Sequence, residues 1–270
     1  RSNLGLKTLY DLCNVKSEPS VFDLGFRLGP RINAGGRIGK SSHGAELLIC
    51  DDPQKAYQIA NALDKSNKER QSIEFNLSKI INDEVKKYHN HPILVLAGKD
   101  WHEGVIGIIA SKIKDKYNKP TIIISLNDNF GKGSARSVVG FDIGAQIIQA
   151  VQLGILSKGG GHKMAGGFTI FKDKVSEFRD FLIKKYQKYK INNSDEINLF
   201  IDTIIAPSAL NLDFFEKVNF LGPFGSGNSE PRFVIENTKV IKSNVVGDNH
   251  ISSILTGKDG TTFKTFTPNG

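Results

Sequence analysis

The chain has 270 residues, of which 39% are hydrophobic and 24% charged, so it is long enough for one or two domains with cores of their own. No apolar run approaches the roughly 18 residues that a membrane helix needs, and the first residues do not form a secretory signal, so we expect a cytoplasmic protein without membrane contact. The two cysteines lack a zinc-binding spacing and fit a reducing compartment. A net charge of +8 favours an anionic partner such as nucleic acid, without identifying one.

The first fifty residues predict two short helices around a glycine-rich segment. Apolar residues at helical spacing predict helices over 1–14 and 42–50. Between them, residues 23–39 read DLGFRLGPRINAGGRIG and are expected to be a loop that carries Arg31 and Arg37. These arginines either face solvent or point at a phosphate or a neighbouring domain. Because the chain opens without methionine and inside a helical pattern, we expect it to be a piece of a longer protein.

A long helix follows. Asp52 suits its N-cap and Pro53 its first position, and no glycine or proline interrupts the pattern up to about Tyr88. A helix of this length spans about 50 Å. Its two ends carry apolar residues at helical spacing, whereas residues 64–72 read DKSNKERQS. We therefore expect a connector between two domains.

Residues 91–190 alternate between strand and helix patterns, which predicts an α/β domain. The expected strands are 93–98, 121–126 and 168–171, and the expected helices begin near Val105 and cover 141–156 and about 174–189.

The last part of the chain has a different character. A polar stretch at 191–196 is expected to be a linker, and residues 197–270 contain short β-rich runs separated by turns. This pattern predicts a small, partial β-barrel.

Three segments of the α/β region carry the candidate binding residues: 100–104 (DWHEG), 131–137 (GKGSARS) and 159–167 (GGGHKMAGG). The last two are expected to be loops. Because loops at one edge of an α/β sheet commonly meet at a ligand, we expect one substrate site. Its expected members are Trp101, His102, Ser134, Arg136, Ser137, Gly160, Gly161 and His162, with Arg31 and Arg37 from the earlier segment.

These residue types suit a phosphate. Glycines leave the backbone N–H groups open to a ligand, and Arg136 is the natural clamp because its guanidinium is planar and always charged. Ser134 and Ser137 add neutral donors. The plainer alternative for segment 159–167 is a structural turn with a hydrogen-bonded histidine.

The aromatic and titratable candidates have open alternatives. Trp101 either stacks on a base or belongs to the core. His102 and Glu103 either cap a helix and bind substrate or form an acid–base pair. No residue is assigned as catalytic, and only His102 and His162 are placed to assist. No convergent set of acids and histidines predicts a metal site, since His89-Asn90-His91 fits a helix end.

Taken together, five segments resemble the RecJ family of single-strand-specific exonucleases in the DHH phosphoesterase superfamily. They are FRLGPRINAGGRIG (26–39), DWHEGVIGIIASKI (100–113), GSARS (133–137), GGGHKMAGGF (159–168), with Gly166 where that family usually has alanine, and LGPFGSGNSEPRF (221–233).

The resemblance implies a layout. Residues 1–50 would end a DHH catalytic domain, 51–90 would form the connecting helix, 91–190 a DHHA1 domain and 197–270 part of an oligonucleotide-binding (OB) barrel. It also implies Mn²⁺ or Mg²⁺, held by Asp and His residues of the DHH domain, most of which would lie outside this chain.

The implied activity is 5′→3′ hydrolysis of single-stranded DNA in repair and recombination, to which this chain would contribute DNA binding and positioning without activity of its own. Single-stranded DNA is the implied partner, with a single-strand-binding protein or a helicase as further candidates. One alternative is a phosphodiesterase for short oligonucleotides or cyclic dinucleotides, against which the β-rich end of the chain argues. Another is a non-catalytic nucleic-acid-binding module.

Overall fold

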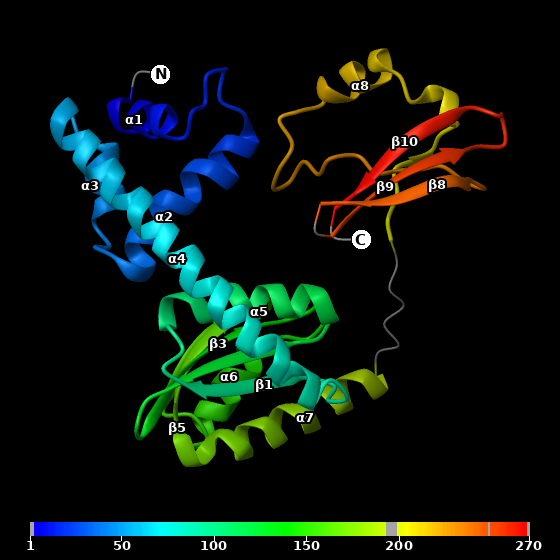
Figure 1. The fold of residues 1–270 in the computed structure, drawn as a ribbon. Helices are drawn as coiled ribbons and strands as arrows, with labels where there is room; N and C mark the ends of the chain where they lie inside the picture. The colour runs from blue at the N-terminus through cyan, green and yellow to red at the C-terminus, as the bar shows by residue number, and fades with distance from the viewer. Residues whose placement is uncertain (1–2, 193–198, 248, 269–270) are drawn as a thin grey trace. The chain divides into compact units, whose positions relative to one another are not determined.

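The computed structural model describes residues 3–192, 199–247 and 249–268. The chain divides into two units, Arg1–Asp195 and Glu196–Gly270 (Figure 1). In the part that the structure describes, no helix is both long and apolar enough to cross a membrane.

The first unit begins with helices: α1 (Leu4–Leu12), the π-helical segment η1 (Asp23–Leu28), α2 (Gly29–Ile38) and α3 (His43–Leu48). The expectation of a loop over 23–39 is therefore wrong.

Packing explains why the glycine-rich segment is helical. Pro30 is the second residue of α2, which continues directly from the π-helical segment η1. A Cβ on Gly35 would lie 2.8 Å from the Lys40 carbonyl oxygen and 3.2 Å from the Leu63 side chain. The missing side chain lets α2 lie directly against the long helix that follows, and this tertiary contact outweighs the low helix propensity of glycine.

The expected connecting helix is present as α4 (Pro53–Tyr88), 36 residues long and capped by Asp52, whose carboxylate accepts from the backbone N–H groups of Gln54 and Lys55. One buried stripe runs along it with alternating spacings of four and three residues. Its polar middle lies in the same stripe as its apolar ends: Ala56, Ala60, Leu63, Asn67, Arg70, Glu74, Leu77 and Ile81.

A mixed five-stranded sheet forms the centre of the α/β region, in the order β1-β2-β3-β5-β4. Its strands are β1 (Leu94–Lys99), β2 (Thr121–Leu126), β3 (Phe130–Arg136), β4 (Lys158–His162) and β5 (Ala165–Phe171). Only β1 and β2 are parallel; the other neighbours are antiparallel. The α/β prediction is confirmed.

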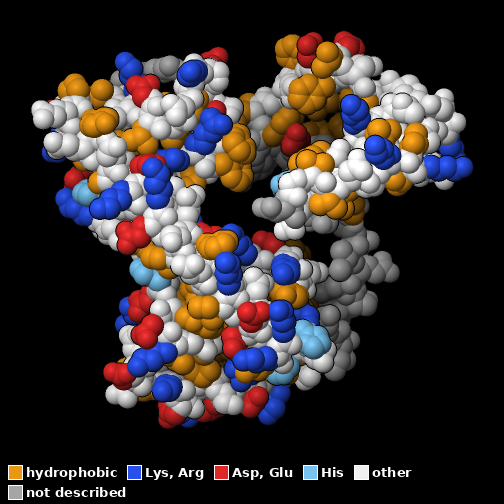
Figure 2. Space-filling model, in the orientation of Figure 1, with side chains coloured by type: hydrophobic (Ala, Val, Ile, Leu, Met, Phe, Trp, Pro, Cys, Tyr) orange, Lys and Arg blue, Asp and Glu red, His pale blue; other side chains and the backbone are white. Residues whose placement is uncertain are grey.

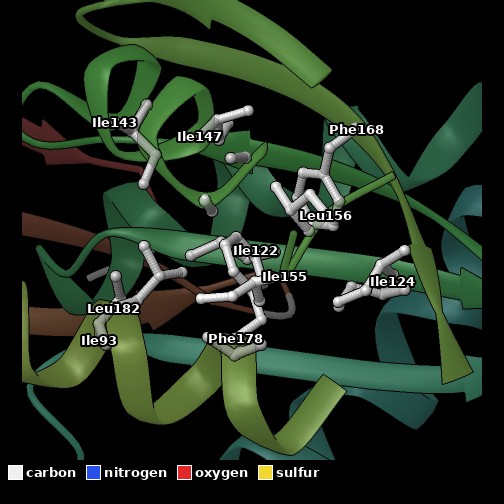
Figure 3. Close-up of a cluster of buried hydrophobic side chains, with 14 of the residues drawn as sticks. Ile93, Ile122, Ile124, Ile143, Ile147, Ile155, Leu156, Phe168, Phe178 and Leu182 are labelled. Atoms are coloured by element: carbon white, nitrogen blue, oxygen red, sulfur yellow. The ribbon is translucent and has the colours of Figure 1, made fainter. Parts of the chain in front are cut away.

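Helices cover both faces of this sheet. α5 (Glu103–Tyr117) lies on one face, and α6 (Ile143–Gln152) and α7 (Val175–Asn192) lie on the other; Figure 1 shows α5 and α7 on opposite sides. The short segment η2 (Lys172–Lys174) leads into α7. Between the sheet and α6 and α7 is a core of Ile122, Ile124, Ile147, Phe168 and Phe178 (Figure 3). Burying each such side chain contributes about 1.5–3 kcal/mol.

Two segments expected as loops are strands. Residues 131–137 belong mostly to β3, and 159–167 form the β4–β5 hairpin. In β3, buried Gly131, Gly133 and Ala135 alternate with partly exposed neighbours, which is the period of a strand. A Cβ on Gly133 would lie 2.1 Å from the Phe168 ring, so glycine makes room for that ring in the core.

The buried polar residues of α4 connect it to two other helices. Arg70 forms an ion pair with Glu74, which also accepts from Lys112 of α5 at 2.5 Å. Asp64 accepts from Arg31 of α2 at 2.8 Å. Because each of these buried charges has an opposite partner, the buried polar residues of α4 fix how this helix lies against α2 and α5.

The second unit is β-rich. The strands β6 (Thr203–Ile204) and β7 (Phe233–Val234) pair in parallel, and β8 (Lys239–Val246), β9 (His250–Thr256) and β10 (Thr262–Thr267) form an antiparallel sheet in the order β10-β9-β8. Two helical segments, η3 (Pro207–Ala209) and α8 (Leu212–Asn219), lie between β6 and β7 in sequence. These open sheets match the expected partial OB-like barrel. The expected linker overlaps the end of α7 at 191–192, and its remainder lies outside the described residues.

Candidate functional site

The candidate site lies on the face of the sheet that α5 covers over β2 and β3. Strand pairing arranges the outward residues of β3, β5 and β4 in rows, and on β5 and β4 Gly167 and His162 are exposed. From one end of β3 toward the other, the rows are Arg136–Ala165–His162, Ser134–Gly167–Gly160 and Lys132–Thr169–Lys158.

The surface of the first unit carries many lysine and arginine side chains, and Figure 2 shows them spread among acidic and apolar ones on the face in view. Net charge alone therefore does not single out a binding face. The partners of individual side chains and the space around the glycines distinguish one face of the sheet.

The glycines on the two faces of the β4–β5 hairpin have different reasons to be glycine. A Cβ on Gly159 or Gly166 would lie 2.8 or 2.4 Å from the side chain of Ile147 on α6, so those positions have no room. A Cβ on Gly160 would meet nothing within 4 Å, and one on Gly167 only a backbone oxygen of β3 at 3.7 Å. The fold therefore does not require glycine at these two outward positions, called the glycine floor below, where the bare backbone leaves space for close approach of a ligand.

Arg136 borders this glycine floor and is held by neutral groups. Its Nε donates to Ser111 Oγ at 3.1 Å, and its Nη1 donates to Ser134 Oγ at 3.1 Å and to the Ala135 carbonyl at 2.8 Å. Within the described residues, Nη2 has no hydrogen-bond acceptor and the guanidinium forms no ion pair. The side chain is thus fixed in position while its charge stays available to an anion.

A second arginine approaches from α2. Arg37 Nη1 donates to the Gly104 carbonyl at 3.0 Å, and a Cβ on Gly104 would lie 2.1 Å from the Arg37 carbonyl oxygen, so the end of α2 touches the start of α5. Burial, and then the positive charge of Arg37, hold the pKa of Arg136 below its usual value. Arginine stays protonated at neutral pH even so, and a bound anion would relieve both costs.

The structure does not bring the three predicted segments together at one edge of the sheet. Lys99, the last residue of β1, pairs with Leu126 at one end of β2, whereas Arg136 pairs with Thr121 at the other end. Segment 100–104 follows β1 and thus begins at the end of the sheet away from Arg136. The expectation rested on parallel strands, and β3 runs antiparallel to β2.

Several predicted site residues have structural partners. The Trp101 ring is only 8% exposed and packs on Gly98, as its core alternative predicts. His102 caps α5, its Nδ1 accepting from the Gly104 N–H at 3.1 Å. Glu103 pairs with Lys132 at 2.6 Å, outside any pair with His102.

Ser137 and Arg31 are also engaged within the fold. Ser137 is buried, and its hydroxyl donates to the Phe141 carbonyl at 2.6 Å. Arg31 is occupied by Asp64. Roles of these two residues in binding stay predictions.

Two residues that were not predicted from the sequence hold the Arg136 side chain in position. Gly107 and Ser111 are one turn apart on α5 and face β3, where a Cβ on Gly107 would lie 3.1 Å from Arg136 Nη2. The signal was present as a Gly-x-x-x-Ser spacing within the predicted helix.

Among the described residues, no group of three or more His, Cys, Asp or Glu side chains is placed to hold a metal ion. These residues thus do not offer the donor set that a two-metal centre needs.

Comparison with known proteins identifies both units. Residues 90–188 match the DHHA1 domain family, and residues 201–267 match the RecJ OB domain. The chain belongs to the RecJ family. It is 32% identical over 269 residues to the single-stranded-DNA-specific exonuclease RecJ of Haemophilus influenzae, covering 95% of this chain and 46% of that protein. For RecJ of Bacillus subtilis the identity is 30%, with 92% and 32% covered.

Solved RecJ structures show the same fold. RecJ from Thermus thermophilus in complex with Mn²⁺ superimposes with a TM-score of 0.83 at 23% identity, over 100% of this chain and 39% of that one. An exonuclease RecJ bound to manganese gives a TM-score of 0.60 at 25% identity, over 69% and 46% of the two chains. This RecJ-family chain spans less than half the length of the relatives it matches.

Proposed function

We propose that the outward face of β3, β5 and β4 binds the backbone of single-stranded DNA, and that the protein acts as a RecJ-type 5′→3′ exonuclease in DNA repair and recombination. One observation carries the binding proposal. A positioned arginine without a carboxylate partner stands beside a glycine floor that the fold itself does not require.

The proposed reaction is metal-assisted hydrolysis of a phosphodiester, with Mn²⁺ or Mg²⁺ as in the RecJ structures from Thermus thermophilus. Such a metal lowers the pKa of an attacking water and neutralises charge on the phosphate. Its ligands are proposed to lie in a DHH domain outside the residues described here. In the proposed division of the chain, 1–50 ends that domain, 51–90 connects, 91–190 is the DHHA1 domain and 197–270 the OB-type domain.

The residues of this chain would hold the strand before the reaction. Arg136 Nη2 faces a phosphate oxygen, and Ser134 keeps its own hydroxyl proton to donate because its Oγ accepts from Arg136. The open backbone at Gly160 and Gly167 lets the sugar–phosphate chain lie close to the sheet. His162, at the β4 end of the row that contains Arg136, is a further donor. Fixing the strand in this way removes orientational freedom before bond cleavage.

The RecJ OB match favours a long strand over a cyclic dinucleotide, because OB folds bind extended single strands in a groove. A single-strand-binding protein or a helicase as partner, and a cytoplasmic location, stay predictions.

Fluorescence anisotropy tests the binding proposal. The 270-residue chain is titrated onto single-stranded and duplex DNA, each with and without a 5′-phosphate, across a salt series. We expect a preference for single strands that grows with the 5′-phosphate. Arg136→Ala should weaken binding and reduce the log–log salt slope by about 1, because one phosphate contact is lost. Lys55→Ala, which removes an exposed positive charge on α4, is the matched control.

If Arg136→Ala and the parent chain have equal affinity and equal salt slope, Arg136 does not bind a phosphate and the proposed clamp is wrong. The same chain incubated with Mn²⁺ should show no nuclease activity above background. Robust activity in a clean preparation would mean that the chain holds a metal site of its own, and would refute the division of labour proposed here.

A further inference from the structure

The outward face of the sheet does not end at the glycine floor. Alternation along β3 and β5 places Phe130 and Phe171 on the same face as Arg136, one row beyond Lys132 and Thr169. Phe130 and Phe171 are cross-strand partners, and their ring centroids lie 4.6 Å apart.

Both rings of this cross-strand pair are open to solvent. Each is 45% exposed, although Phe168 and Ile170 on the opposite face of β5 are buried. By contrast, the ring of Phe168 on the opposite face packs against Phe178 of α7. Left open, the pair presents ring surface to a ligand.

An open groove with a volume of about 700 Å³ lies beside these rings, which is ample for a base. Its lining combines the two rings with hydrogen-bonding groups of Asn129 and Lys172 and the carboxylates of Asp128 and Asp173. Rings next to both donors and acceptors suit a nucleobase, which stacks through its face and hydrogen-bonds through its edge. The two carboxylates argue against a phosphate at this end.

The distance between Arg136 and the phenylalanine rings fits one continuous single strand of DNA. Arg136 and Phe130 are six positions apart on β3, which is about 20 Å along a strand, a span that a few nucleotides of extended DNA cover. Between Arg136 and Phe130, the outward face of β5 carries the small residues Gly167 and Thr169. Lys158 on β4 adds an exposed positive charge.

We propose that Phe130 and Phe171 form a base-stacking platform for the same single strand whose phosphate Arg136 holds. The proposal rests on the proposed function and extends it along the sheet: phosphates lie near Arg136 and Lys158, and a base stacks on the rings. The sheet of the DHHA1 domain would then contact a few consecutive nucleotides of one strand.

Abasic scanning tests this proposal. A series of 5′-phosphorylated oligonucleotides, each with one abasic site at a different position, is titrated onto the 270-residue chain and onto the Phe130→Ala/Phe171→Ala double variant. We expect one or two positions at which the abasic site weakens binding to the parent chain at least about fivefold, and no effect at those positions in the double variant. Phe75→Ala, which removes an aromatic side chain 61% exposed on α4, is the control.

Length dependence gives a second readout. The double variant should bind a thymidine dinucleotide as the parent does, because so short a strand does not reach both ends, and should bind a long strand more weakly. An abasic effect that persists in the double variant, or an equal loss for both lengths, overturns the platform. Phe130→Leu and Phe171→Leu keep the apolar packing and carry the same expectations if the alanine variant fails to fold.

Arg136→Ala in the same assays separates the two proposals. If it weakens binding while the phenylalanine variants do not, only the platform fails. If Arg136→Ala has no effect on any strand, the phosphate clamp itself is wrong.

Discussion

Replacing Gly107 by alanine should disturb the phosphate clamp while leaving the fold intact. Gly107 lies inside α5, and a Cβ there would sit 2.9 Å from Ser134 Oγ and 3.1 Å from Arg136 Nη2. Both atoms are the ends of side chains, so they can move aside. The backbone does not need to shift.

The magnitudes have opposite signs for stability and for binding. Alanine in a helix interior is favoured over glycine by about 0.5–1 kcal/mol, which offsets the cost of moving two partly buried side chains. Moving the guanidinium away from Ser134 and from a bound phosphate removes a hydrogen bond to a charged group, which contributes about 1.5–3 kcal/mol. We therefore expect stability within about 1 kcal/mol of the parent and affinity for single-stranded DNA lowered about tenfold or more.

Urea unfolding and anisotropy titrations measure both quantities on the same preparation. Gly25→Ala is the matched control, because a Cβ at Gly25 meets nothing within 4 Å and lies away from Arg136 in sequence. A Gly107→Ala chain that binds as tightly as the parent would refute the reasoning, since the clamp would then not depend on the position of Arg136. Lower affinity with a large loss of stability would also contradict it, by showing that the helix itself had moved.

Three further sets of substitutions test other parts of the structure. Gly160→Ala should leave the unfolding midpoint unchanged and weaken DNA binding. Gly161→Ala should destabilise the hairpin, because its Cβ would lie 2.4 Å from a backbone oxygen. The reverse pattern would contradict the division of these glycines between two faces of the hairpin. Hydrogen bonds from a lysine and a serine lower the pKa of Glu46 to about 2 from 4.5, so its contribution to stability is present above pH 4.5 and is lost as the pH falls toward 2; Glu46→Gln should flatten the acid unfolding profile in that window. Glu74→Gln should cost about 3–5 kcal/mol in urea unfolding by leaving the buried Arg70 without its counter-charge, and replacing both by leucine should cost less.

The sequence predicts the fold well where hydrophobic periodicity is undisturbed. The helix α4, the buried strands β1 and β2 and the α/β class follow from runs of isoleucine, leucine and valine. The pattern fails where glycine replaces the apolar residue. Gly131 and Gly133 occupy inward positions of β3, but glycine has no side chain to mark the alternation, so the pattern indicates a loop where the chain forms a strand.

The candidate site was predicted in part. Arg136, Ser134 and the outward glycines lie together, because register in an antiparallel sheet aligns them. Trp101 does not join them, because a single ring gives no sign in sequence of whether its partner is a base or the core. Its neighbour Gly98, three residues earlier, is the feature that makes room for the ring, and that relation is visible only in three dimensions.

The contact between α2 and α5 brings together arginines from two different segments of the chain. Arg37 comes from the helical segment at the start of the chain and Arg136 from the sheet, and only the absence of a side chain on Gly104 lets the two segments meet. An anion that touches both arginines also ties these segments together. If single-stranded DNA supplies that anion, as proposed, thermodynamic reciprocity requires the strand to stabilise the junction by the same free energy by which an intact junction strengthens DNA binding. Under the proposed function, assembly of the α2–α5 junction and binding of DNA are therefore thermodynamically linked.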